Sequence, residues 1–181
     1  MNSINLEALE KEYRETPLNS KKYAVRLTNY IDGLLLKGRV IEAKYYFKKL
    51  IEAKPNHLRT IKLGYSISIS SFDNEGVRKF DSQLYQSRPS KTEISWFRLK
   101  YYISVNNIRD VESHCEFLLS QKLNREQLNT ILDVCINSKN YFIVSKLCDY
   151  LKRNKMRLEG SGVISIKKIA LQQLANTLTK V

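Results

Sequence analysis

The chain has 181 residues, of which 43% are hydrophobic and 27% are charged, a balance that allows a packed core beneath a charged surface in one domain or one short array of repeats. Its 31 basic residues outnumber 18 acidic ones, for a net charge of +13. So basic a chain suggests an acidic partner, namely nucleic acid, an acidic peptide or an anionic membrane surface, unless the charge serves solubility alone.

Several classes of protein are excluded at once. No segment approaches the apolar length that a membrane span requires, and the first residues lack the basic and apolar regions of a secretory signal. The cysteines Cys115, Cys135 and Cys148 form no close pair, which argues against a disulfide framework. We therefore expect a cytoplasmic chain, because the reducing cytosol is the simplest compartment for it.

The first expected helix begins after a cap at Ser3 and ends before Pro17. Its apolar face holds Leu6, Leu9 and Tyr13. A second helix is expected from about Lys21 to Lys37, because apolar residues recur there at steps of three and four. These residues are Tyr23, Leu27, Tyr30, Ile31 and Leu34.

The stretch from Ile31 to Asn56 reads as a helical hairpin. Gly38 is expected at the turn, because glycine lets the backbone bend freely. Pro55 ends the second helix, since it has no N–H and its ring clashes with the preceding turn. The apolar face of that helix holds Val40, Ala43, Phe47, Leu50 and Ile51. One hairpin cannot bury its own apolar face, so the chain should contain more of them.

The stretch from Leu58 to Ser71 is ambiguous. Tyr65 to Ser71 alternates with a period of two, which favours a half-buried strand. A helical face is also present, made by Leu58, Ile61, Tyr65, Ile69 and Phe72. We predict a helix, because a lone strand would find no partner elsewhere in the sequence.

The next helices are marked by caps. Asp73 or Asn74 is expected to begin a helix that ends near Gln86. Ser90, followed three residues later by Glu93, has the pattern of a capping box and predicts a further helix. The inward residues of that helix are expected to be Trp96, Leu99, Tyr102 and Ile103.

Three more helices are expected before residue 158, separated by turns at Asn106–Asn107 and Ser138–Asn140 and by a cap at Asn124. In the helix from Asp110 to Gln121 the inward residues are Val111, Cys115, Leu118 and Leu119. In the next they are Leu128, Ile131, Leu132 and Cys135. In the third, from Tyr141 to Asn154, they are Val144, Leu147, Cys148 and Leu151.

The clearest break in the chain is Glu159-Gly-Ser-Gly162, which reads as a flexible joint. We therefore expect a helical domain at 1–158 and a separate C-terminal helix at 159–181. The apolar residues of this last helix are Ile166, Ala170, Leu174 and Leu178. Capping of a repeat array is its expected role; a homo-oligomer contact or a connection to a further domain are the alternatives.

The hairpin resembles the tetratricopeptide repeat. Pro55 and Pro89 are 34 residues apart, the period of that family. Ala43, Phe47 and Leu50 stand where its signature has a small, an aromatic and a packing residue. Shifting by one period gives Val77, Asp81 and Leu84; later shifts give Val111, Cys115 and Leu118, then Val144, Cys148 and Leu151. The resemblance implies an all-α, right-handed α-solenoid of about four helix-turn-helix repeats, with an N-terminal helix and a C-terminal capping helix.

The sequence from Ile31 to Ala43 is also similar to the pentatricopeptide repeat, a family that binds single-stranded RNA. That resemblance implies base-reading side chains at a fixed place in each repeat. Thr28 and Asn56 fit in the first repeat, but neither Ile61 nor Lys62 fits in the next. The modular code therefore breaks after one repeat, although phosphate contacts through lysines would survive.

The tetratricopeptide resemblance implies a binding groove lined by the first helix of each repeat. The groove residues are Thr28, Asp32, Arg59, Lys62, Ser66, Trp96, Lys100, Asn129 and Asp133. Arg59, Lys62 and Lys100 would form a central positive patch beside Trp96, suited to an acidic or C-terminal peptide. The family's carboxylate clamp is not reproduced, because Thr28 and Asp32 stand where it would begin. A core position is the favoured interpretation of Trp96, since it neighbours the apolar face of its helix, and a binding anchor is the alternative.

Catalytic motifs are missing from the sequence. His57 and His114 do not combine with the cysteines at any spacing typical of structural zinc, and Cys115 and Cys148 are expected to pack between helices as small hydrophobes. We find no phosphate loop, nucleophile elbow or paired-carboxylate motif. We therefore expect no enzyme activity, no metal and no cofactor.

The sequence thus predicts a non-catalytic protein-interaction scaffold. RNA binding is the first alternative, and an assembly domain of a larger envelope-polysaccharide enzyme is the second. Basic clusters lie on most hairpins, where each is expected to be a solvated face. They are Lys21-Lys22, Lys37 with Arg39, Lys48-Lys49, Arg98 with Lys100, Lys152-Arg153 with Lys155 and Arg157, and Lys167-Lys168.

Overall fold

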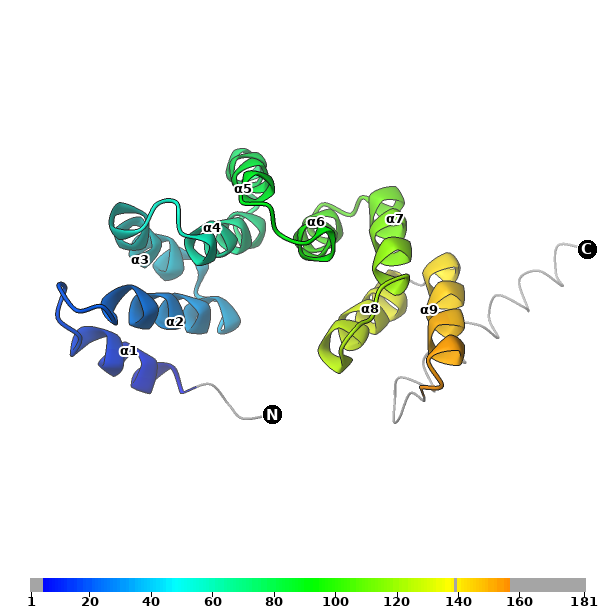
Figure 1. The fold of residues 1–181 in the computed structure, drawn as a ribbon, viewed down its shortest axis with the longest axis horizontal. Coiled ribbons are helices and arrows are strands. Elements are labelled where there is room, and N and C mark those ends of the chain that lie inside the picture. Colours follow the sequence, from blue (N-terminus) through cyan, green and yellow to red (C-terminus); the bar gives the residue numbers. More distant parts are fainter. Residues whose placement is uncertain (1–4, 139, 157–181) are drawn as a thin grey trace, which may run out of the picture. The chain divides into compact units, whose positions relative to one another are not determined.

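The computed structural model describes residues 5–138 and 140–156. Every regular element in these ranges is an α-helix and none is a strand, which confirms the all-α prediction (Figure 1). The helices are α1 (Leu6–Arg14), α2 (Tyr23–Leu36), α3 (Val40–Ala53), α4 (Leu58–Ser70), α5 (Asn74–Gln86), α6 (Lys91–Ser104), α7 (Ile108–Leu119), α8 (Arg125–Ser138) and α9 (Tyr141–Arg153).

The chain divides into two compact units between Phe97 and Arg98, inside α6. The first unit holds α1 to α5 and the beginning of α6; the second holds the rest of α6 and α7 to α9. The predicted joint at Glu159–Gly162 and the predicted helix at 159–181 lie outside the described residues and stay predictions.

In the first unit, each helix from α1 to α5 packs against the next, and α2 also contacts α4. Figure 1 shows α2, α3 and α4 as neighbours joined by short turns. The predicted inward residues of this unit are mostly buried, among them Leu27, Tyr30, Ile31, Leu34, Ala43, Phe47, Leu50, Val77 and Leu84. The hairpins therefore bury their apolar faces against one another, because a single hairpin has nothing else to cover it.

The ambiguous stretch forms the helix α4, as predicted. Its helical face is buried at Ile61 and Tyr65 and half-buried at Ile69, but Leu58 and Phe72 are exposed. The predicted face was therefore wrong at both ends, because Phe72 lies beyond the last residue of the helix. Gly64 lies where the neighbouring helices come closest: a Cβ at this position would stand 2.7 Å from Cζ of Phe47 and still closer to the ring of Phe80. The two rings meet edge to face with 5.8 Å between their centroids. The absence of a side chain at Gly64 thus lets α3 and α5 bring their aromatic rings together over α4.

Helix ends follow the expected chemistry with one correction. Gly38 adopts φ +72° at the first turn, a conformation that glycine accepts without strain. The Asp73 side chain accepts from the Gly76 N–H at 2.9 Å and caps α5. The cap of α1 is Asn5, whose Oδ1 accepts from the Ala8 N–H at 3.1 Å. The prediction of Ser3 as this cap was wrong, since both residue types cap helices equally well and only the geometry separates them.

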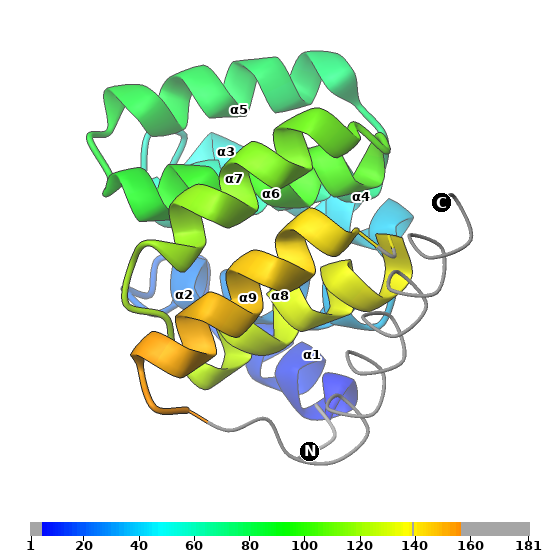
Figure 2. The same ribbon diagram turned by 90° about the vertical axis from the view of Figure 1, so that its right-hand side faces the viewer.

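In the second unit, α9 packs against both α7 and α8, and Figure 2 shows these helices side by side. The predicted inward residues of α7 are all buried. Asn124 caps α8 in a reciprocal arrangement: its Oδ1 accepts from the Gln127 N–H at 2.9 Å, while Gln127 Oε1 accepts from the Asn124 N–H at 3.0 Å. The tyrosine hydroxyl of Tyr150 accepts from the Leu123 N–H at 3.0 Å, which ties α9 to the start of α8.

The inward face of α9 differs from the prediction. Cys148 is exposed and Leu151 only half-buried, whereas Ile143, Val144, Leu147 and Tyr150 are buried. The expectation that Cys148 packs between helices was therefore wrong, because the larger Ile143 and Tyr150 rotate the buried face of the helix by part of a turn.

Smaller differences of the same kind occur on α6 and α8. Ile103 is exposed, Leu132 and Trp96 are half-buried, and Ser95 and Leu99 form the buried side of α6.

Candidate interaction face on the first helices of the hairpins

Two of the predicted groove residues meet between α2 and α4. The Arg59 guanidinium donates from Nη2 to Asn29 Oδ1 at 2.8 Å and pairs with Asp32 Oδ2 at 3.4 Å. The Asp32 and Arg59 side chains are each 47% exposed. Burial raises the pKa of the Asp32 carboxyl above its ordinary value, against the opposing charge of Arg59. The pair lies at the surface, where each side chain keeps about half of its area exposed.

A second pair joins α4 to α6. The Lys62 ammonium forms an ion pair with Glu93, and the two side chains are 30% and 33% exposed. Nearby, the rings of Tyr65 and Phe97 stack with 5.0 Å between centroids and an angle of 17°. These two pairs therefore connect helices that are not consecutive in the chain, α2 with α4 and α4 with α6.

Other predicted residues of the first unit lie deeper. Thr28 is only 4% exposed, and its hydroxyl donates to the Ala24 carbonyl at 2.6 Å. Ser66 is half-buried. Trp96 is also half-buried, and its indole Nε1 is enclosed without a hydrogen-bond partner.

The remaining predicted residues belong to the second unit. Lys100, Asn129 and Asp133 are exposed on α6 and α8. Asp133 borders a cavity of about 340 Å³ whose wall includes Ile108 and Val134. Their part in a common groove stays a prediction.

Sequence reasoning missed Asn29 and the second role of Glu93. Asn29 lies three residues before Asp32, so it shares the face that was predicted to line the groove. Glu93 was interpreted as part of a capping box. Its backbone N–H donates to Ser90 Oγ at 3.2 Å, as that motif requires, while its carboxylate pairs with Lys62. Glu93 lies one 34-residue period after Arg59 and is an acidic residue close to the expected face, which was the signal available.

The two histidines have structural contacts. His57 caps α4 by accepting the Arg59 N–H on Nδ1 at 3.3 Å. The His114 ring stacks on Tyr102 with 5.4 Å between centroids. Over residues 5–138 and 140–156, no group of three or more potential ligands is arranged to hold a metal ion. None of the helices in these ranges is both long and apolar enough to cross a bilayer.

Comparison with known proteins adds no relative: no protein-family model, no curated protein and no solved structure matches this chain.

Proposed function

We propose that the chain is a non-catalytic protein-interaction scaffold that binds an acidic or C-terminal peptide on the first helices of a tetratricopeptide-like, right-handed solenoid of about four repeats. The observation that carries the proposal is the pair of ionic links between these helices, Asp32 with Arg59 and Lys62 with Glu93. The tetratricopeptide resemblance, which uses the sequence alone, also assigns Asp32, Arg59 and Lys62 to one face.

Burial at the repeat positions supports the same register. The small-residue position is filled by Ala43, Val77, Val111 and Val144, all of them buried. The later packing position is buried at Leu50, Leu84 and Leu118. Asp81, which departs from the aromatic of the signature, accepts the Tyr65 hydroxyl at 2.9 Å and so has a structural role of its own.

The proposed binding step is an exchange of carboxylates. A peptide carboxylate replaces Glu93 at Lys62, or Asp32 at Arg59, so the cation is never left without a partner. Surface ion pairs contribute only about 0–1 kcal/mol, so little free energy opposes the exchange. The Trp96 indole N–H adds a donor for a peptide carbonyl beside the cations.

The test uses random octapeptides with a free C-terminal carboxylate, the same peptides amidated, and a short oligouridine as the RNA probe, all followed by fluorescence anisotropy. Lys62→Gln should weaken peptide binding by about tenfold, the usual size of a lost charge-assisted hydrogen bond. Glu93→Gln should strengthen it, because the competing internal carboxylate is gone. Lys48→Gln and Lys152→Gln change the net charge equally and should leave it unchanged.

Two results would overturn the proposal. One is oligouridine binding that is tighter than peptide binding, falls steeply with salt and weakens by similar steps in all the lysine variants, which is the behaviour of a phosphate binder. The other is a Glu93→Gln variant that binds peptide less well than the native chain, since the pair would then be part of the binding geometry rather than a competitor.

A further inference from the structure

Four tyrosines from three helices form one cluster in the first unit. Tyr13 of α1 stacks on Tyr30 of α2 with 5.7 Å between ring centroids and an angle of 9°. Tyr46 of α3 meets Tyr30 edge to face at 5.0 Å and Tyr13 at 5.6 Å. Tyr23 completes the cluster, 5.7 Å from Tyr13. Such pairs hold the rings in fixed orientations, because edge-to-face and offset contacts are favoured over other arrangements.

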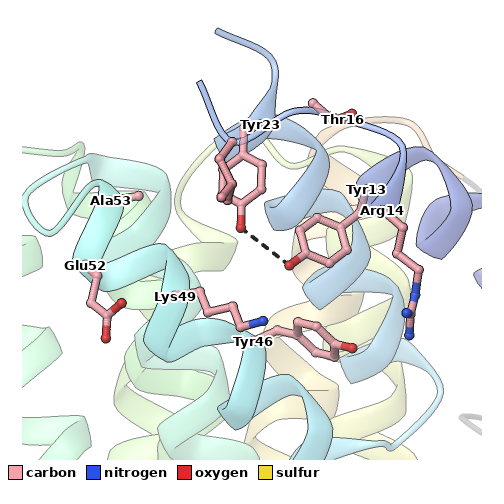
Figure 3. A pocket seen from close by; sticks show the side chains of 9 residues that line it. Tyr13, Arg14, Thr16, Tyr23, Tyr46, Lys49, Glu52 and Ala53 are labelled. Carbon is pink, nitrogen blue, oxygen red and sulfur yellow. Dashed lines mark hydrogen bonds between the residues drawn. The ribbon is translucent and has the colours of Figure 1, made fainter. Parts of the chain in front are cut away.

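A cavity of about 860 Å³ opens beside this cluster (Figure 3). Tyr13, Tyr23 and Tyr46 form its aromatic wall, and Leu18 adds an apolar side chain that is 80% exposed at the edge. Lys49 of α3 reaches into the same space. The cavity therefore combines ring faces, hydroxyl groups and one ammonium group on a rigid support.

Lys49 is the cation of this wall that has no carboxylate partner in the described part of the chain. Its Nζ lies 5.1 Å from the Tyr45 ring centroid and 5.4 Å from that of Tyr46. Arg14, the other cation of the wall, is bonded to Glu10 at 2.6 and 2.8 Å. Figure 3 shows the Lys49 ammonium directed toward Tyr46, with the Glu52 carboxylate turned away from it.

Two hydroxyl groups stand above the ammonium. Tyr13 Oη and Tyr23 Oη lie 3.4 Å apart and share one hydrogen bond, so the proton of the second hydroxyl remains free to donate. Burial, together with the bond to Tyr13, raises the pKa of Tyr23 to about 12. The Tyr23 hydroxyl is therefore a protonated donor at neutral pH.

We propose that this cavity binds an oxyanion, a carboxylate or a phosphate, carried on a small aromatic or aliphatic body. The Lys49 ammonium and a tyrosine hydroxyl would hold the anion, and the ring faces with Leu18 would hold the body. A cationic ligand is disfavoured, because Lys49 already occupies the position over the Tyr45 and Tyr46 rings where a cation would bind. This site is separate from the interaction face and does not depend on the proposed function.

The test uses four probes that share a benzene ring: phenylacetate, phenyl phosphate, phenylacetamide and benzyltrimethylammonium. Binding is followed by nuclear magnetic resonance of the chain labelled at its tyrosine rings. The carboxylate and the phosphate should shift signals of Tyr13, Tyr23 and Tyr46 at lower concentration than the neutral amide, and the cation should bind least. The anion that binds more tightly shows whether the site prefers a carboxylate or a phosphate.

Three variants test the residues. Lys49→Gln should weaken anion binding by about tenfold, and Tyr23→Phe by about threefold or more, as expected for losing a charged and a neutral hydrogen-bond donor. Lys48→Gln is the matched control, because it removes the same charge from the adjacent exposed position and should leave affinity within about twofold. Thermal melting of each variant shows whether it remains folded.

The proposal is overturned if the amide binds as tightly as the anions, if the cation binds best, or if Lys48→Gln weakens binding as much as Lys49→Gln does. The first result would mean that charge is not recognised, the second that the rings act as a cation cage, and the third that the anion is attracted by net charge alone.

Discussion

The two units of the chain differ in the ionic links that are described between their helices. In the first unit, ionic links join α1 to α2 through Glu12 and Arg26, α2 to α4 through Asp32 and Arg59, and α4 to α6 through Lys62 and Glu93. In the second unit, Lys146 of α9 pairs with Glu116 of α7.

The second unit adds hydrogen bonds to its link. Asn140 Nδ2 donates to Glu112 Oε1 at 2.6 Å, and Arg153 Nη2 donates to the Leu119 carbonyl at 3.2 Å. In the first unit, α3 and α5 meet instead through the aromatic rings of Phe47 and Phe80. The difference teaches that the residues at the edge of the core, polar between α7 and α9 and aromatic between α3 and α5, decide how neighbouring helices are linked.

The largest contrast should appear in thiol reactivity. Cys148 is exposed, whereas Cys115 and Cys135 are buried, and burial raises the pKa of each of these two thiols to about 12. At mildly alkaline pH the Cys148 thiol should react with a disulfide reagent. The Cys115 and Cys135 thiols should react only when the chain unfolds, because the thiolate is the reacting form and they are buried. Cys148→Ser should abolish the fast reaction. A fast reaction of more than one thiol would contradict the buried positions of α7 and α8.

Replacing a leucine by alanine should destabilise the two units by different amounts, even at positions that the predicted repeat makes equivalent. Leu84 of α5 is 0% exposed, and Leu84→Ala should cost about 2–5 kcal/mol of the free energy of unfolding. Leu151 of α9 stands in the same register but is half-buried, so Leu151→Ala should cost about 1 kcal/mol or less. Urea denaturation measures both. Equal losses would mean that the buried face of α9 follows the repeat register after all.

The aromatic contact of the first unit should be sensitive to Gly64. Gly64→Ala places a Cβ against Phe47 and Phe80, and overpacking of this kind costs about 1–3 kcal/mol, partly offset by the better helix propensity of alanine. A second substitution, Phe80→Leu, removes the ring edge and should make Gly64→Ala less costly. If the alanine costs the same in both backgrounds, Phe80 is not what limits the space.

The ionic links of the two units should be similar in strength and small. Double-mutant cycles of Lys62 with Glu93 and of Lys146 with Glu116 should each give about 0.2–1 kcal/mol, because all four side chains are partly solvated. Added salt should reduce both coupling energies. A coupling of several kcal/mol in one unit would show that its link stabilises the fold rather than merely connecting helices.

Much of the first unit was predictable because its signals are local. Gly38, the cap at Asp73 and the burial of Ala43, Phe47 and Leu50 follow from spacing and residue type within one hairpin. The helical nature of α4 also followed, once a lone strand was judged unable to find a partner.

The misses depend on contacts between distant residues. On α9, apolar residues cover enough of the surface that Cys148 and Tyr150 were both plausible inward positions, and packing against α7 and α8 decides between them. Likewise, the pairing of Glu93 with Lys62 and the meeting of Tyr13 with Tyr46 join helices that no local pattern brings together.

The smallest expected effect is a pH dependence confined to the first unit. Burial raises the pKa of Asp32 in the folded chain above its value in the unfolded chain, where it is 3.8. Between these two values the folded state binds more protons, so the contribution of Asp32 to stability is largest at low pH and is lost as the pH rises through the folded-state pKa. Asp32→Asn removes this titration and should flatten that part of the stability profile. The change should be small because the side chain is 47% exposed and Arg59 offsets its charge.

Urea denaturation from pH 3 to pH 6 measures the profile, and Asp133→Asn, which removes an exposed carboxylate of the second unit, is the control. A native profile in which stability rises with pH more steeply than in Asp32→Asn would show that the attraction of Arg59 outweighs burial, and the pair would then stabilise the face instead of standing ready for exchange.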